Sequence, residues 1–147
     1  MGKPPEVHEI LKRAEAYCKE QGVRFTAGRA AVLQEVLRQR KPVKAYDVLQ
    51  AISTDKARPM PPIVYRALDF WMSHGFLHRI ESQNAYTACL HPGCGHECQI
   101  FVCEQCGRVF EICDEHLAGQ VRHQAAACGF RIDHLKIEAT GRCPDCQ

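Results

Sequence analysis

The sequence predicts an α+β protein in which a winged helix-turn-helix domain precedes a small, cysteine-rich α/β domain. Three observations support this prediction. Apolar residues recur at helical spacing through most of the first half of the chain. Two short segments at the end of that half are typical of a β-hairpin. Nine of the ten cysteines fall within residues 89–147, where they include two C-x-x-C pairs.

Length and composition limit the possibilities. A chain of 147 residues exceeds one minimal core but is short for two average domains, so we expect one domain or two small ones. The net charge of +2 does not by itself indicate a nucleic-acid-binding protein. Residues 1–6 lack the apolar stretch of a signal peptide, and no apolar run is long enough to span a membrane. We therefore expect a cytoplasmic protein, whose thiols stay free or bind metal and do not form disulfides.

Three helices are expected in the first part of the chain. Apolar residues recur at helical spacing over residues 7–18, and Gly22 suits the left-handed conformation that closes a helix. Thr26 can cap a second helix that runs to about Arg40. Residues 45–52 are typical of a third, short helix, which a proline-marked loop follows.

A fourth helix is expected from Pro62, at its first turn, to Gly75, which ends it. Its spacing predicts one packed face and one free face. The packed face consists of Val64, Ala67, Leu68 and Trp71. The free face consists of Tyr65, Arg66, Asp69 and Ser73.

The first domain should end in a hairpin of residues 76–81 and 85–89, joined by a turn near 82–84. Helices followed by such a hairpin make a winged helix. If Gln83 and Asn84 centre the turn, His78 lies directly opposite Cys89. Side chains paired in this way have Cβ atoms about 5 Å apart, so both can reach one metal ion.

The second part of the chain is expected to form strands around one helix. Residues 99–102 and 108–112 are typical of strands, Asp114 can cap a helix that reaches Cys128 and Gly129, and a further strand is expected over 130–139. This order gives an α+β unit. We place the winged helix in residues 1–90, a hinge in 91–95 and the second domain in 96–147.

The clearest chemical signal is the pair of C-x-x-C motifs formed by Cys103, Cys106, Cys143 and Cys146. Each motif can chelate one metal, and four thiolates satisfy tetrahedral zinc with no open position, which favours a structural site. A redox-active C-x-x-C would follow a strand and open a helix, which neither motif does. An iron–sulfur cluster could use four thiolates but has no further support in the sequence.

A second ligand set is possible. His78 and Cys89 on the hairpin, with His96 and Glu111 nearby in the sequence, would supply N, S, N and O ligands, a set acceptable to zinc. The alternative is that His78 is a half-buried hairpin residue and Cys89 a small core thiol. Cys94 and Cys98 are either spare thiols or further zinc ligands. Cys113, His116 and His123 are candidates for another metal site.

The free face of the fourth helix is a candidate DNA-reading surface. In a winged helix, Arg66 can enter the major groove and hydrogen-bond to guanine, with Tyr65 beside it. The alternative is a merely solvated face. Further positive charge lies in the same half of the chain, at Arg24, Arg29, Arg38, Arg40, Lys41 and Lys44.

These features together resemble the ferric uptake regulator (Fur) family, and most closely its zinc uptake regulator branch. The resemblance covers nearly the whole chain. It rests on Arg24-Phe25-Thr26 with Arg29, Ala45-Tyr46-Asp47-Val48-Leu49, Val64-Tyr65-Arg66-Ala67-Leu68, Gly75-Phe76-Leu77-His78 and both C-x-x-C pairs.

The resemblance implies a homodimeric repressor with two zinc ions per monomer that binds palindromic double-stranded operator DNA when zinc occupies a site at the hinge. It implies no enzymatic activity and no small-molecule substrate. Tyr46 and Arg66 match family residues that contact bases. The regulatory zinc ligands would be His78, Cys89, His96 and Glu111. The structural ligands would be Cys103, Cys106, Cys143 and Cys146.

The chain departs from the family pattern at two places. Iron-sensing members carry a His-His-Asp-His run where this chain has Gly95-His96-Glu97-Cys98, which favours zinc over iron or peroxide sensing. Ile63 replaces the usual threonine or serine of the recognition helix, so a hydroxyl that could cap the helix or touch phosphate is missing.

The alternatives to a zinc-responsive repressor are another metal or peroxide sensor of the family, a zinc-ribbon interaction module that binds no DNA, and a thiol redox protein or hydrolytic zinc enzyme. A hydrolytic enzyme would need an open metal position, whereas both proposed sets fill four.

Overall fold

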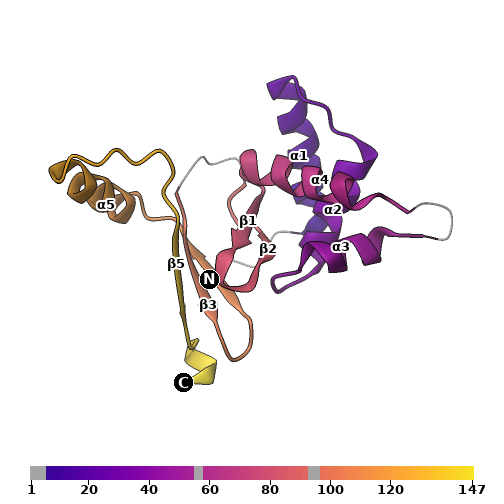
Figure 1. The fold of residues 1–147 in the computed structure, drawn as a ribbon. Coiled ribbons are helices and arrows are strands. Elements are labelled where there is room, and N and C mark those ends of the chain that lie inside the picture. The colour runs from indigo at the N-terminus through magenta and orange to yellow at the C-terminus, as the bar shows by residue number, and fades with distance from the viewer. Residues whose placement is uncertain (1–5, 55–57, 93–96) are drawn as a thin grey trace. The chain divides into compact units, whose positions relative to one another are not determined.

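The computed structural model describes residues 6–54, 58–92 and 97–147. The chain divides into two compact units, Met1–Cys94 and Gly95–Gln147. Figure 1 shows the helices and a two-stranded hairpin of the first unit, and the three-stranded sheet and helix of the second. The predicted α+β class, with an N-terminal winged helix, is confirmed.

Four helices build the first unit, and all four were predicted. They are α1 (Val7–Gln21), α2 (Ala27–Arg38), α3 (Ala45–Ile52) and α4 (Pro61–Ser73). Helix α2 ends two residues before the predicted Arg40, and α4 begins one residue before Pro62.

The expected caps explain where these helices begin and end. Gly22 adopts φ 67° after α1, a left-handed conformation that costs glycine little. Thr26 Oγ1 accepts a hydrogen bond of 3.2 Å from the backbone N–H of Arg29, so it caps α2 as predicted. Two prolines fill the first turn of α4, where the absent N–H has no intrahelical partner to lose.

Helix α4 packs its apolar face against the other helices. Trp71 is fully buried, and its indole Nε1 donates a 2.8 Å hydrogen bond to the carbonyl of Arg29 in α2. The predicted packed face is buried, and the predicted free face is exposed. The largest fully buried side chains of this core are Trp71, Phe76, Ile10, Leu33 and Leu68.

The hairpin forms, but its predicted register is wrong. Strands β1 (Leu77–Ile80) and β2 (Ala85–Ala88) pair antiparallel, with His78 opposite Thr87 and not opposite Cys89. The turn is the 3₁₀ segment η1 (Glu81–Gln83) followed by Asn84 at φ 47°, so its centre falls one residue earlier than predicted. A one-residue shift of the centre moves every cross-strand partner by two residues, which keeps each side chain on its face.

The second unit is a three-stranded sheet with one helix. Strands β3 (Gln99–Cys103), β4 (Val109–Ile112) and β5 (Ile137–Gly141) lie in the order β4-β3-β5, with β5 parallel to β3. Helix α5 (Glu115–Ala127) connects β4 to β5, and the 3₁₀ turn η2 (Pro144–Cys146) follows β5.

The last strand, β5, begins later than predicted. It starts at Ile137, so residues 130–136, which were expected to belong to it, precede it. Gly129 adopts φ 77° after α5, and the N–H of Phe130 donates back to the carbonyl of Ala125. Phe130 therefore belongs to the helix cap, and its side chain is 65% exposed. None of the helices in the described residues is long and apolar enough to cross a membrane.

Candidate metal centre and nucleic-acid interface

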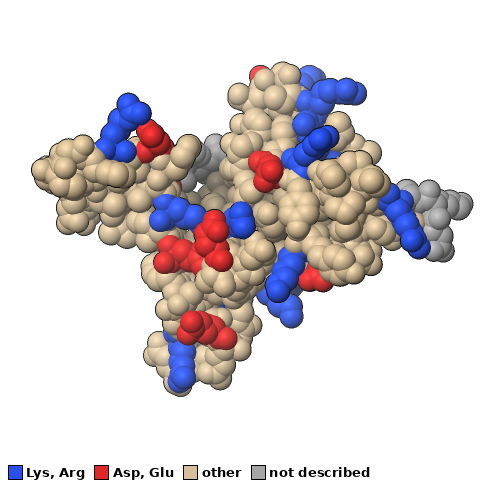
Figure 2. All heavy atoms as spheres, viewed as in Figure 1, with Lys and Arg blue, Asp and Glu red and all other residues tan. Residues whose placement is uncertain are grey.

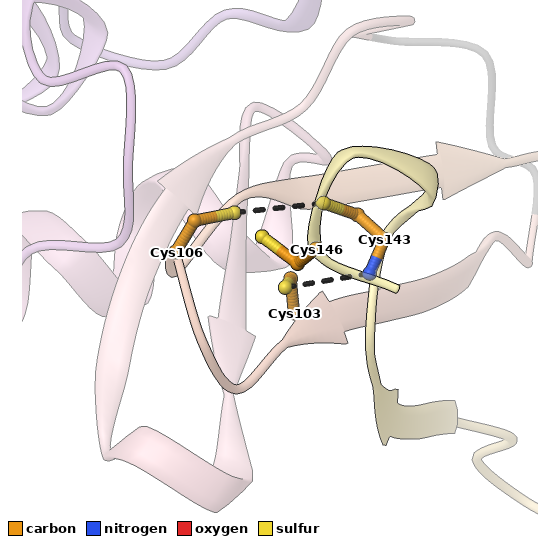
Figure 3. Close-up of side chains that lie close together, drawn as sticks. All are labelled: Cys103, Cys106, Cys143 and Cys146. Atoms are coloured by element: carbon orange, nitrogen blue, oxygen red, sulfur yellow. Dashed lines mark hydrogen bonds between the residues drawn. The ribbon is translucent and has the colours of Figure 1, made fainter.

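Four cysteines of the second unit converge on one point. Cys103 ends β3, and Cys106 lies in the turn that follows. Cys143 and Cys146 bracket η2 at the end of the chain. The parallel pairing of β3 with β5 brings the two motifs together, and the N–H of Glu104 bonds the carbonyl of Gly141 at their junction. Figure 3 shows the four side chains directed toward one another.

The spacing of the sulfurs fits zinc. All four Sγ atoms lie within 4.8 Å of one another, and those of Cys106 and Cys143 are 3.7 Å apart. A tetrahedral zinc with Zn–S bonds near 2.3 Å places its sulfurs about 3.8 Å apart. This four-cysteine cluster therefore has the ligand type, number and separation of a closed, structural zinc site.

Hydrogen bonds already favour a thiolate in this cluster. The backbone N–H groups of Cys143 and Cys106 point at the Cys103 sulfur and lower the pKa of that thiol to about 6. Hydrogen bonding to the Cys143 thiol, together with burial, raises the pKa of Cys146 to about 12. A divalent cation would stabilise all four as thiolates, because thiolates are the form that binds metal.

The hairpin of the first unit carries His78 and Cys89, the first two residues of the second predicted ligand set. His78 lies half-buried in β1, and Cys89 is buried just after β2. Cys89 is two residues beyond Thr87, the partner of His78, so the two side chains share one face of the hairpin. Their ligand atoms lie within 4.8 Å of each other, so the pair can bind one metal despite the corrected register.

Of the other two predicted ligands, Glu111 and His96, the structure describes only Glu111. Glu111 lies in β4 of the second unit, paired with Ile100 of β3, and its side chain is half-buried. The Sγ atom of Cys113 is 3.6 Å from Glu111 Oε1. His96 lies outside the described residues.

Cys98 and Cys113 form a disulfide, which corrects the expectation that all thiols stay free or bind metal. The β3–β4 register pairs Gln99 with Ile112, so these two cysteines occupy the next position along the ladder, with Cα atoms 4.2 Å apart. The buried Gln99 side chain holds both flanking segments: its amide bonds the carbonyls of Glu97 and Asp114 and the N–H of Asp114. The register of β3 against β4 would have predicted this disulfide, whereas the spacing of the cysteines in the sequence alone does not.

Replacing Cys98 by serine should lower the unfolding free energy of the second unit by about 3 kcal/mol in the absence of reductant, because a cross-link over 15 residues no longer restricts the unfolded chain. Urea denaturation measures this change. In excess dithiothreitol the variant and the parent should unfold alike. Equal midpoints without reductant, with both cysteines open to alkylation in the parent, would show that the disulfide does not form.

The predicted base-reading residues are accessible. Tyr46 in α3 is 66% exposed, Tyr65 in α4 is 51% exposed, and Arg66 is exposed beside it. A hollow between the starts of α2 and α4 brings together basic groups that are far apart in the sequence. It is lined by Arg24, Thr26, Gly28, Arg29, Ile63, Arg66 and Ala67.

Charge is divided between the two units. Residues 1–94 carry 14 Lys and Arg against 9 Asp and Glu, a net charge of +5, whereas residues 95–147 carry 5 against 8, a net charge of −3. The overall +2 therefore conceals a basic first unit, around which Figure 2 shows Lys and Arg side chains on the face in view. A basic unit with an exposed helix face suits binding to phosphate-rich double-stranded nucleic acid.

Known proteins resemble the chain over most of its length. The zinc uptake regulation protein of Escherichia coli (strain K12) is 39% identical over 139 residues, covering 94% of this chain and 81% of that protein. The peroxide operon regulator of Bacillus subtilis (strain 168) is 30% identical over 142 residues, covering 95% and 94%. A solved structure described as a zinc uptake regulator complexed with zinc and DNA matches with a TM-score of 0.88 and 37% identity, covering 96% of this chain and 95% of that one.

The sequence model of the ferric uptake regulator family matches residues 20–140, which include all four helices of the winged helix in whole or part and the first C-x-x-C pair. The match spans far more than half of the chain. With the helix order, the hairpin and the four-cysteine cluster in place, the chain belongs to the ferric uptake regulator family.

Proposed function

We propose that the protein is a zinc-responsive transcriptional repressor, which binds palindromic operator DNA as a homodimer when zinc is plentiful and so represses zinc uptake genes. The observation that carries the proposal is the 39% identity with the zinc uptake regulation protein over 94% of the chain. The basic helical unit and the four-cysteine cluster support it. The protein is thus a regulator without an enzymatic reaction.

Two zinc ions per monomer would have different roles. The four-cysteine cluster would hold one ion in a closed site and stabilise the second unit. The regulatory ion would be held by His78, Cys89, His96 and Glu111. Only one of these four ligands is a thiolate, so this site should exchange its metal more readily than the other.

Metal occupancy would control DNA binding through the fraction of binding-competent protein. His78 and Cys89 are on the hairpin of the winged helix, and Glu111 is in the second unit. Zinc held by all of them would restrict the orientation of the DNA-binding domain. A dimer whose recognition helices are held at the half-site spacing gains affinity in proportion to that competent fraction.

A homodimer is supported by apolar side chains that the second unit leaves exposed. Phe101 in β3 is 39% exposed and Ile112 in β4 is 52% exposed. Large exposed apolar groups on a small unit favour contact with a second copy. A two-fold axis would present two winged helices, as a palindromic operator requires.

A peroxide or iron sensor is the second candidate, because the peroxide operon regulator is 30% identical to the chain. The ligand chemistry argues for zinc. Cys89 contributes a soft thiolate, and the run of residues 95–98 lacks the full set of histidines and the aspartate of the iron-sensing pattern. Zinc, but neither iron(II) nor manganese(II) at equal free concentration, should promote DNA binding.

Replacing Arg66 by alanine should weaken zinc-dependent DNA binding about 10- to 100-fold, because a bidentate contact with a base is lost. Fluorescence anisotropy across buffered free zinc measures it, on a duplex selected from a random pool by the zinc-loaded parent protein. Arg131→Ala is the matched control: its side chain is 88% exposed in the second unit, and the variant loses the same charge. An Arg66 variant with parental affinity and zinc content would contradict the placement of Arg66 in the major groove, whereas a parent protein that selects no duplex would favour the interaction-module alternative.

A further inference from the structure

An exposed apolar side chain stands at the start of α4, the proposed recognition helix. Ile63 is 48% exposed, although Val64, its neighbour in sequence, is 1% exposed in the core. The other exposed residues of the helix beyond the prolines are polar or aromatic with a polar end, namely Tyr65, Arg66, Asp69 and Ser73. Ile63 therefore does not serve the core of its own domain.

Ile63 is positioned beside the basic groups of the same face. It lies three residues before Arg66, so the two side chains are neighbours on the helix surface, and both line the hollow at the start of α2. The guanidinium of Arg29 in that hollow donates a 2.5 Å hydrogen bond to the carbonyl of Arg24. It also makes a cation–π contact with Phe70, with its Cζ atom 3.7 Å from the centre of the ring. Ile63 thus projects next to cationic groups, of which Arg29 is held in place, and offers no hydrogen bond itself.

The chemistry of the major groove limits what Ile63 can contact there. Base edges in this groove present hydrogen-bond donors and acceptors, and the thymine C5-methyl is their apolar group. Residues at the N-terminal end of a recognition helix are those that reach base edges. We propose that Ile63 packs against a thymine methyl in each operator half-site, next to the base that Arg66 contacts, and so selects thymine at that position.

This inference rests on the proposed DNA-binding function, and a test can separate the two. The probe is the duplex selected by the zinc-loaded protein, with each thymine of one half-site replaced in turn by uracil, which removes only the methyl. One replacement should weaken binding of the parent about fourfold, the value of one buried methyl-sized group. Ile63→Ala should bind the unmodified duplex more weakly by a similar factor and lose its sensitivity to that uracil.

Met60→Ala is the matched control, because Met60 is a 65% exposed apolar residue directly before the same helix. This variant should keep the parental sensitivity to uracil. The inference is overturned if no uracil weakens binding of the parent, or if Ile63→Ala stays as sensitive as the parent. If the zinc-loaded parent selects no duplex at all, the proposed function itself fails. The uracil series on the unaltered protein keeps the test valid even if a variant folds poorly.

Discussion

Replacing Cys143 by serine should unfold the second unit and remove one zinc ion per chain. The unit has only 53 residues, and its described part buries few side chains, among which are Cys103 and Cys143 themselves. A core of this size stabilises a fold weakly on its own. Structural zinc contributes about 10 kcal/mol or more in small domains, so losing one ligand should cost about 5 kcal/mol or more. Elemental analysis and near-ultraviolet and far-ultraviolet circular dichroism measure the two effects.

Cys128→Ser is the matched control for this experiment. Cys128 lies in the same unit at the end of α5, is exposed, and is outside the four-cysteine cluster. The control should keep its zinc and its thermal transition, and the Cys143 variant should lose both while α1 to α4 stay folded. A Cys143 variant with the parental zinc content and transition would refute the structural assignment.

Local signals in the sequence were sufficient to predict the helices. Thr26 and Gly22 mark helix ends through their own hydrogen bonds and backbone conformation, and Trp71 lies on an apolar face of helical period. Such features depend on residues within a few positions of each other. The strand boundaries were harder, because whether residue 130 begins a strand depends on how the preceding helix closes.

The two candidate metal sites differed in how far the sequence could predict them. Each C-x-x-C pair is a local chelate, and the structure joins the two pairs through the parallel β3–β5 ladder, as a shared zinc site requires. The face shared by His78 and Cys89 was predicted correctly even though their register was not, because an error of two residues preserves the side of a strand. The disulfide was missed because the expected cytoplasmic location argued against any disulfide, and because Cys98 and Cys113 meet only through the pairing of separate strands.

Replacing His78 by alanine should abolish zinc-dependent DNA binding over the range of free zinc that saturates the parent, with a loss of about 100-fold or more in affinity for the selected duplex. Even a change to a residue that only supports a ligand costs about 10- to 100-fold in metal affinity, and removal of a ligand should cost at least as much. With the regulatory site empty, the binding-competent fraction falls, and the apparent affinity for DNA falls by the same factor. Fluorescence anisotropy across buffered free zinc measures this loss.

Zinc content distinguishes a sensing defect in this variant from misfolding. The parent should hold two zinc ions per chain and keep one after mild chelation, whereas His78→Ala should hold one from the start, because its four-cysteine cluster is intact. His8→Ala is the matched control, since His8 is an exposed histidine on α1 of the same unit. If the His78 variant binds DNA at the same free zinc as the parent, the hairpin pair is not part of the sensor. If the parent itself holds only one zinc that survives chelation and gains no second, the chain has no exchangeable site through which zinc could control DNA binding.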